Sequence, residues 1–302
     1  MNWFLIALAA PVLWALVNHI DKYIISRYFT GRGVGSLVLF TALSGAIISI
    51  FILIFSPGSL GIGFVSAIII AINGALLVAS FIPYLHALED EEASYVTALF
   101  QLIPVFAYVL GAIFLHEYLT LSQIFASMLI IAGAMIISLD LSHSVRFKVK
   151  PFWLMILSTF MLAVNALIFK IVALEGNFWG TAFWEYVGGG IFGLLLFSAY
   201  RLYREQFLAT IRKSRATILS LNISSELLNV AAKLLANFAS LLAPLALVWV
   251  VNGFQPFIVF VYGIILTLFI PRWGKENLGK RAVIQKVSAI VIIFVGIIFL
   301  FR

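Results

Sequence analysis

The sequence contains no cysteine, which excludes disulfide bonds, thiolate metal sites and cysteine nucleophiles together. Charged residues are also scarce, at 10 % of the chain, whereas a soluble globular domain has about 25 %. A chain with so few charges cannot cover itself with polar surface in water. We therefore expect its solvent to be lipid.

Long hydrophobic runs fill the chain, and 64 % of its residues are hydrophobic. A helix needs about 17 to 25 apolar residues to cross the hydrocarbon core of a bilayer. Ten runs of this kind are predicted, at residues 3–24, 34–55, 64–86, 93–115, 121–139, 152–173, 179–200, 216–238, 244–269 and 282–301. They should be helices, because lipid satisfies no backbone polar group and the alternation of a lipid-facing barrel is absent. The predicted fold class is an all-α integral membrane protein with ten transmembrane helices.

The basic residues explain the net charge of +7 without nucleic acid. Sixteen of the 19 lysines and arginines fall in the loops between spans one and two, five and six, seven and eight, and nine and ten, or in the span ends beside these loops. Short loops rich in Lys and Arg stay in the cytoplasm. We therefore predict a multi-pass protein of the plasma (inner) membrane, in contact with the lipid bilayer, with both termini on the non-cytoplasmic side and no nucleic-acid partner.

The sequence repeats itself. Sliding residues 66–116 along by 152 positions, without a gap, superimposes identical residues, namely Ala87 on Ala239, Pro104 on Pro256, Gly111 on Gly263 and Ile113 on Ile265. Residues 1–142 and 151–302 are thus predicted to be two five-helix repeats. A repeat with an odd number of helices inserts its second copy upside down, and inverted repeats of this kind are typical of secondary transporters.

The run from Ala87 to Gly133 resembles the EamA-type domain of the drug/metabolite transporter superfamily. The resemblance rests on Ala87-Leu88, Pro104, Phe114-Leu115-His116-Glu117-Tyr118-Leu119-Thr120, Gln123 and Ile130-Ile131-Ala132-Gly133. It implies a ten-helix carrier of small organic solutes with a central cavity. Members of the superfamily are usually described with cytoplasmic termini, so the resemblance and the charge count predict opposite orientations.

Glu226 is the strongest candidate for coupling transport to protons. It lies about ten residues into its span, near the bilayer midplane, where a charged side chain costs at least about 2.5–3.5 kcal/mol. A carboxylate at this depth can exchange a proton. The alternative is a packed polar residue that is hydrogen-bonded between helices and has no part in transport.

Lys233 and Lys170 lie in the outer thirds of their spans. The default interpretation is that their aliphatic stems carry the ammonium groups to the membrane interface. If the two lysines line the cavity instead, they favour an anionic or zwitterionic solute.

Pro104 and Pro256 are predicted to kink their helices, because each removes the hydrogen bond to the carbonyl four residues earlier. Gln101 and Gln255 lie beside them, so a collar of free carbonyls and amides around a solute is one interpretation. A kink that only shapes packing is the other.

The remaining candidates are amide and aromatic side chains at similar depths. Substrate binding or translocation is predicted for Trp14, Asn18, Asn73, Tyr84, Gln101, Tyr108, Asn165, Asn229, Lys233, Asn252 and Gln255. Aromatic residues near a membrane interface are more often anchors, which is the alternative for these side chains. Gly188-Gly189-Gly190 and Gly193 predict close approach of helix backbones.

Catalytic and metal-binding patterns are poor. The four histidines and the carboxylates are dispersed, and there is no phosphate-binding P-loop. We expect no catalytic residue, metal or cofactor, and predict a secondary active transporter that moves a small organic metabolite by alternating access, with proton-coupled export as its leading mode. The open alternatives are an integral membrane enzyme and a lipid-headgroup flippase, and the protein is expected to be a monomer or a homodimer.

Overall fold

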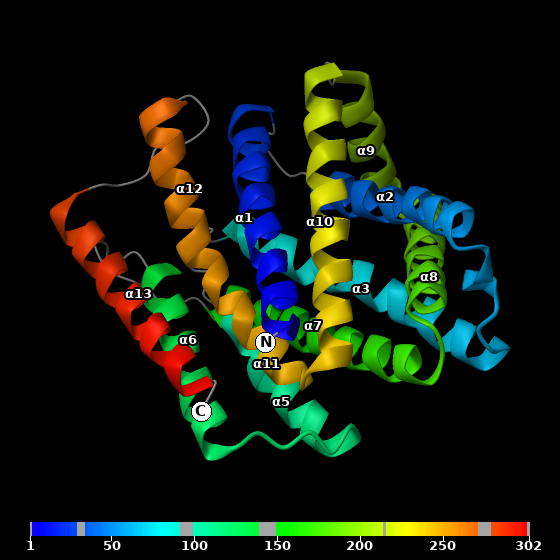
Figure 1. Ribbon diagram of the computed structural model, residues 1–302. Helices are drawn as coiled ribbons and strands as arrows, with labels where there is room; N and C mark the ends of the chain where they lie inside the picture. Colours follow the sequence, from blue (N-terminus) through cyan, green and yellow to red (C-terminus); the bar gives the residue numbers. More distant parts are fainter. Residues whose placement is uncertain are drawn as a thin grey trace.

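The computed structural model describes residues 2–28, 34–90, 99–138, 149–213, 216–270 and 279–300 (Figure 1). All regular elements in these ranges are helices, and no strand occurs within them. The α-helices are α1 (Asn2–Tyr28), α2 (Val34–Phe55), α3 (Phe64–Asp90), α5 (Ile103–Phe114), α6 (Leu121–Ser138), α7 (Val149–Glu175), α8 (Phe178–Ala199), α9 (Arg201–Lys213), α10 (Ala216–Leu242), α11 (Leu245–Val251), α12 (Gln255–Phe269) and α13 (Lys280–Leu300). Three 3-10 segments accompany them: η1 (Pro57–Leu60), η2 (Phe100–Leu102) and η3 (Asn252–Phe254).

Seven helical segments in the described part of the chain are long and apolar enough to cross a membrane, and residues 100–114 and 121–136 form shorter apolar helices. The fold class of an all-helical, multi-pass membrane protein is therefore confirmed. Helix α10 is not among these seven segments, although it is as long as α3, at 27 residues. It carries Glu226, Asn229 and Lys233, which lower its hydropathy.

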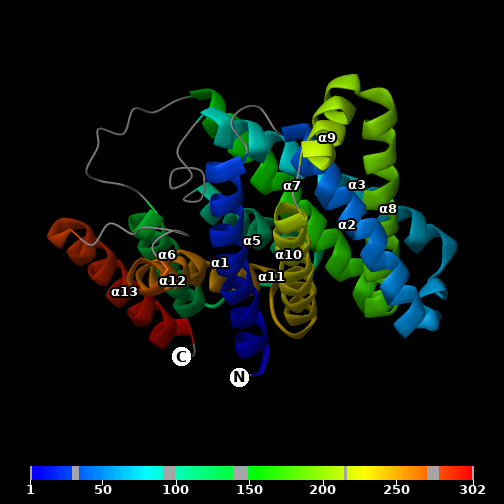
Figure 2. The same cartoon turned by 90° about the horizontal axis from the view of Figure 1, so that it is seen from above.

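Residues 201–213 are predicted to be a loop, because they are too polar to span lipid, but they form helix α9. One of its faces is apolar, and Phe207 packs on Phe40 of α2 with ring centroids 4.9 Å apart. The Gln206 side chain accepts a hydrogen bond from the Gly35 backbone N–H at 3.0 Å. Figure 2 shows α9 beside α2. The connection between α8 and α10 is therefore a helix that packs on α2.

The α-helical pattern is interrupted just before each of the two prolines, within the longer helical segments at residues 100–114 and 245–269. Pro104 occupies the first turn of α5 and Pro256 the first turn of α12. Each follows a 3-10 segment, η2 or η3, which takes up the interrupted hydrogen bonding. Because proline is well suited to the first turn of a helix, both positions are relaxed.

Helices α6 and α13 lie side by side (Figures 1 and 2). A glycine on each helix lies at their contact. A Cβ atom at Gly133 would lie 2.9 Å from the carbonyl oxygen of Ala289, and one at Gly296 would lie 3.0 Å from that of Ala126. The C-terminal half of each helix therefore contacts a more N-terminal part of the other, so the two helices run antiparallel.

Helices α3 and α8 cross in backbone contact. A Cβ at Gly74 would lie 1.8 Å from the Glu185 carbonyl oxygen, and one at Gly188 would lie 1.9 Å from the Ala71 carbonyl oxygen. Gly190 and Gly193 admit α2 on another face of α8. The glycine-rich stretch of α8 thus packs closely against two helices.

Candidate translocation site

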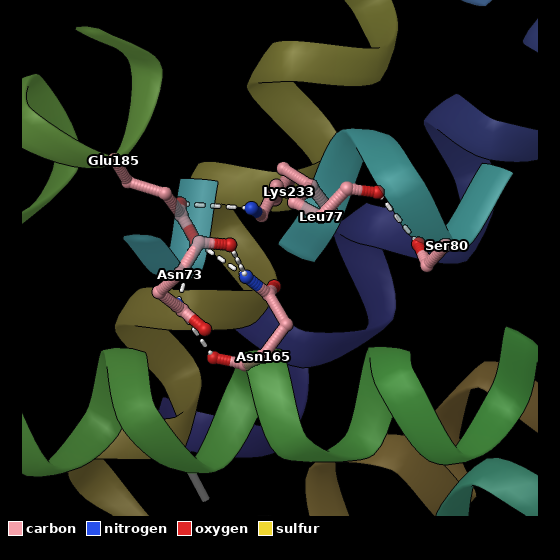
Figure 3. A network of polar contacts seen from close by, with 6 residues as sticks. All are labelled: Asn73, Leu77, Ser80, Asn165, Glu185 and Lys233. Atoms are coloured by element: carbon pink, nitrogen blue, oxygen red, sulfur yellow. Dashed lines mark hydrogen bonds and ion pairs between the residues drawn. The ribbon is translucent and has the colours of Figure 1, made fainter. Parts of the chain in front are cut away.

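A carboxylate that the sequence analysis missed lies at the centre of the polar interior. Glu185 of α8 is 1 % exposed, and its carboxylate accepts hydrogen bonds from Lys233 Nζ of α10 at 2.8 Å, Asn165 Nδ2 of α7 at 2.8 Å and Asn73 Nδ2 of α3 at 3.2 Å (Figure 3). Four helices therefore meet at one buried charge. Its signal was present, because Glu185 is a carboxylate inside the apolar run predicted at residues 179–200.

The two asparagines also bind each other. Asn73 Nδ2 donates to the Asn165 backbone carbonyl at 3.0 Å, and Asn165 Nδ2 donates to the Asn73 carbonyl at 3.1 Å. This reciprocal pair fixes α3 against α7 and aims both amides at Glu185. Asn73 and Asn165 were predicted site residues, and the structure brings them together.

The interpretation that Lys233 and Lys170 extend to the membrane interface is wrong. The side chains are 16 % and 4 % exposed, and each ammonium group is paired with a carboxylate, Glu185 for Lys233 and Glu117 for Lys170. Burial of a charge in lipid is costly, so pairing inside the bundle replaces the route to water.

The second ion pair joins separate segments at one end of the bundle. Lys170 of α7 donates to Glu117 and, at 2.7 Å, to the Ala243 carbonyl oxygen. Glu117 Oε2 also accepts the Leu245 backbone N–H at 2.8 Å, at the start of α11. The carboxylate that follows α5 is thereby tied to α7 and to the turn between α10 and α11.

The sequence motif after α5 is explained by this geometry. His116 has a φ of 55°, a left-handed conformation that reverses the chain after α5 and brings Glu117 back beside Gly111. Thr120 and Gln123 then form a capping box for α6, with a Thr120 N–H to Gln123 Oε1 hydrogen bond of 3.0 Å. The motif thus combines a turn, an ion-pair carboxylate and a helix cap.

Helix α10 presents polar side chains to three neighbours. Glu226 Oε1 accepts from Thr41 of α2 at 3.0 Å, and Asn229 Oδ1 accepts from the indole N–H of Trp14 of α1 at 2.8 Å. Lys233 reaches α8, as described above. The predicted shared face of these residues on α10 therefore contacts three neighbouring helices, α2, α1 and α8.

Gln101 lies on η2, where η2 and η3 both contact α6. Gln101 is buried, and its Oε1 lies 3.6 Å from the position of a Cβ on Gly253. A shift of 152 residues pairs Gln101 with Gly253, not with Gln255, and Gln255 is half-buried. Both amide atoms of Asn252 are buried and have no hydrogen-bond partner among the described residues.

The other predicted residues are more peripheral to the charged network. Tyr84 packs on Phe100 with centroids 5.1 Å apart, and Tyr108 packs in an apolar cluster with Leu245 and Trp249. Asn18 is half-buried on α1.

A cavity of about 220 Å³ lies elsewhere, between the loop before α3 and the turn after α7, and Glu175 and Asn177 are among its lining residues. Within the described ranges no group of three His, Asp or Glu side chains could hold a metal ion.

A multi-pass helical bundle with two buried ion pairs and an amide network defines a membrane protein with a polar interior. Residues 1–139 match the EamA-like transporter family. The match confirms the resemblance to the drug/metabolite transporter superfamily over these residues, and the matched family is one of membrane transporters. A crystal structure of a protein with 12 % sequence identity has the same fold, with a TM-score of 0.72 over 98 % of this chain and 94 % of that one. No curated protein matches the sequence.

Proposed function

We propose that the protein is a secondary carrier of a small organic solute, and that residues 1–142 and 151–302 are inverted five-helix repeats which alternately open the site to each side. Equal helix lengths support the repeat: α1 and α7 both have 27 residues, α2 and α8 both have 22, and α3 and α10 both have 27. The 3-10 segments η2 and η3 begin 152 residues apart, at Phe100 and Asn252.

Helix contacts support the inversion. The antiparallel packing of α6 on α13, with Gly133 and Gly296 exchanging roles, is the contact that a two-fold axis within the membrane plane would generate. The packing of α3 on α7 has its counterpart in that of α10 on α1. Contacts between the two halves thus recur at equivalent pairs of helices.

One observation carries the carrier function: the buried Glu185 network draws side chains from both proposed repeats. Asn73 belongs to the first, and Asn165, Glu185 and Lys233 belong to the second. Ionisable groups in a membrane interior are expensive and mark solute or ion pathways. A site shared by two repeats changes its access when the repeats move against each other.

An asymmetry between equivalent helix pairs supports alternating access. Helix α3 packs along α8, whereas the equivalent helices α10 and α2 touch at few positions. Shifted by 152 residues, Gly74 at the first crossing becomes Glu226 at the second. There the carboxylate accepts a hydrogen bond from Thr41. The α3–α8 crossing is tightly packed through glycines and the α10–α2 crossing is looser, as expected for a carrier that is open to one side.

Cysteine accessibility tests the alternating-access proposal, because the chain has no native cysteine. Gln101→Cys and Gln255→Cys should react with an impermeant reagent from one side of a proteoliposome and from the other after addition of a transported solute. Gly58→Cys, in open space in η1, should react from one side throughout. The proposal is overturned if mixtures of amino acids, nucleobases, sugars and sugar phosphates all leave the side of labelling unchanged.

Proton coupling is proposed for Glu226, because a carboxylate between α10 and α2 can bind and release a proton as these helices move. Glu226→Gln keeps the hydrogen bond to Thr41 but cannot titrate. We expect solute flux that no longer depends on a pH gradient, with normal membrane insertion. Glu205→Gln, on the exposed surface of α9, is the matched control, and retained pH dependence in Glu226→Gln would exclude this residue as the coupling group.

Export, plasma-membrane location and non-cytoplasmic termini remain part of the proposal. Many of the basic loop residues behind the orientation, Arg32 and Arg146 among them, lie outside the described residues.

A further inference from the structure

Two tryptophan rings of the interior lie parallel to each other. The centroids of Trp14 on α1 and Trp249 on α11 are 6.3 Å apart, and their planes differ by 14°. Both side chains are half-buried. The Trp14 ring is fixed by its hydrogen bond to Asn229. Two indoles held in one orientation form a surface on which a further flat ring can stack.

The charged network lies close to this aromatic pair along α10. Lys233 follows Asn229 by four residues, so the two side chains share a helix face and are separated by about 6 Å along the axis. Lys233 is the residue that binds Glu185 at 2.8 Å. An aromatic subsite and a paired ammonium and carboxylate therefore adjoin each other.

Polar atoms without a hydrogen-bond partner among the described residues lie at both ends of this region. The amide of Asn252 follows Trp249 by one helical turn, and Asn73 Oδ1 and the Tyr186 hydroxyl adjoin the Glu185–Lys233 pair. Buried polar groups in proteins are nearly always satisfied. These three side chains offer donors and acceptors that a bound molecule would use.

Building on the carrier function proposed above, we infer that the solute is a zwitterion bearing a flat heteroaromatic ring. The ring stacks on Trp14 and Trp249, and its heteroatom binds Asn252. The solute carboxylate binds Lys233 and its ammonium group binds Glu185.

Charge balance favours a zwitterion over an ion of one sign. Glu185 and Lys233 compensate each other, so a zwitterion can enter the pair by replacing each partner with one of its own groups. A solute with a single charge would leave one side chain uncompensated in a buried place, which is strongly unfavourable. A short linker between the ring and the charged groups covers the single helical turn between the subsites.

Four matched probes test this substrate class on the purified full-length protein. Tryptophan carries the ring and both charges, tryptamine lacks the carboxylate, indole-3-propionate lacks the ammonium group, and alanine lacks the ring. By calorimetric titration we expect tryptophan to bind at least about tenfold more tightly than each of the other three, since each loses one charged or stacking contact. Equal affinities, or binding of none of the four, would overturn the inference.

Variants assign the subsites. Trp249→Ala should weaken tryptophan binding by about tenfold and leave alanine unaffected, whereas Trp249→Phe should retain most of the affinity. Trp153→Ala, at a 62 % exposed tryptophan of α7, is the control and should change nothing. Size-exclusion profiles verify folding, and Trp14→Phe provides a second test of the pair if Trp249→Ala does not fold. Unchanged tryptophan affinity in folded Trp249→Ala would contradict the ring subsite.

The outcome separates the substrate class from the carrier function. If Gln101→Cys changes the side of labelling with some other solute while tryptophan does not bind, the carrier stands and the zwitterion inference fails. If tryptophan binds as expected but never changes the side of labelling, the site is correct and alternating access fails.

Discussion

Glu185→Ala is expected to lower the free energy of unfolding by about 3–5 kcal/mol, because it leaves Lys233 as an uncompensated buried charge. It also removes the shared acceptor of Asn73 and Asn165, so two buried amides lose a partner. The measurement is chemical unfolding of the purified protein in detergent, followed by the change in tryptophan fluorescence.

A double variant separates the two contributions to this loss. Glu185→Ala with Lys233→Met removes both charges and should recover much of the stability, since an apolar replacement of a buried ion pair is often neutral. An additive loss in the double variant would show that the pair is not coupled and would contradict the proposed network.

A surface ion pair supplies the matched control. Arg201 Nε and Glu205 Oε1 of α9 lie 2.6 Å apart, and the two side chains are 83 % and 56 % exposed. Exposed pairs contribute little, because water screens them. Glu205→Ala should therefore unfold at the wild-type denaturant concentration.

The membrane helices could be predicted from the sequence because lipid demands long apolar runs. Residues 34–55 and 64–86 were placed within a few residues of α2 and α3. Helix α9 was missed for the same reason, since it is polar and owes its helical form to packing on α2. Hydropathy identifies helices that contact lipid, but it does not identify a polar helix that is stabilised by packing on another helix.

The partners of the charged residues could not be predicted, because they lie far apart in sequence. Lys233 is 48 residues from Glu185, and Lys170 is 53 residues from Glu117. Seen singly, each lysine has the stem to reach the interface, and only the helix packing decides against it. The depth of a residue in the membrane can be predicted from its position in an apolar run, whereas the orientation of its side chain depends on the tertiary fold.

The amides were recognised with more success than the glutamate between them. Asn73 and Asn165 were predicted as site residues and meet at Glu185. Glu185 was missed because it lies three residues before Gly188, at the edge of a glycine-rich stretch that was interpreted as a packing surface. That stretch has both roles, because the glycines bring α3 near enough for Asn73 to reach the carboxylate.

Gly188→Val tests this double role and is expected to have the second large effect. A Cβ at Gly188 would lie 1.9 Å from the Ala71 carbonyl oxygen and 2.4 Å from its carbonyl carbon. Backbone atoms cannot rotate away, so α3 and α8 must separate. We expect the free energy of unfolding to fall by at least about 1–3 kcal/mol, the usual cost of overpacking, and Gly58→Val, in open space, to be silent.

The Gly188→Val substitution also tests which helix crossing closes the proposed carrier. Helices α3 and α8 pack closely, whereas the equivalent helices α10 and α2 touch at few positions. Separating the closed pair should favour the opposite state of a carrier. In the Gly188→Val protein that folds, Gln101→Cys should therefore react from the side that is protected in the parent. If stability falls while labelling keeps its original side, the glycine contact serves packing alone and the α3–α8 crossing is not the gate.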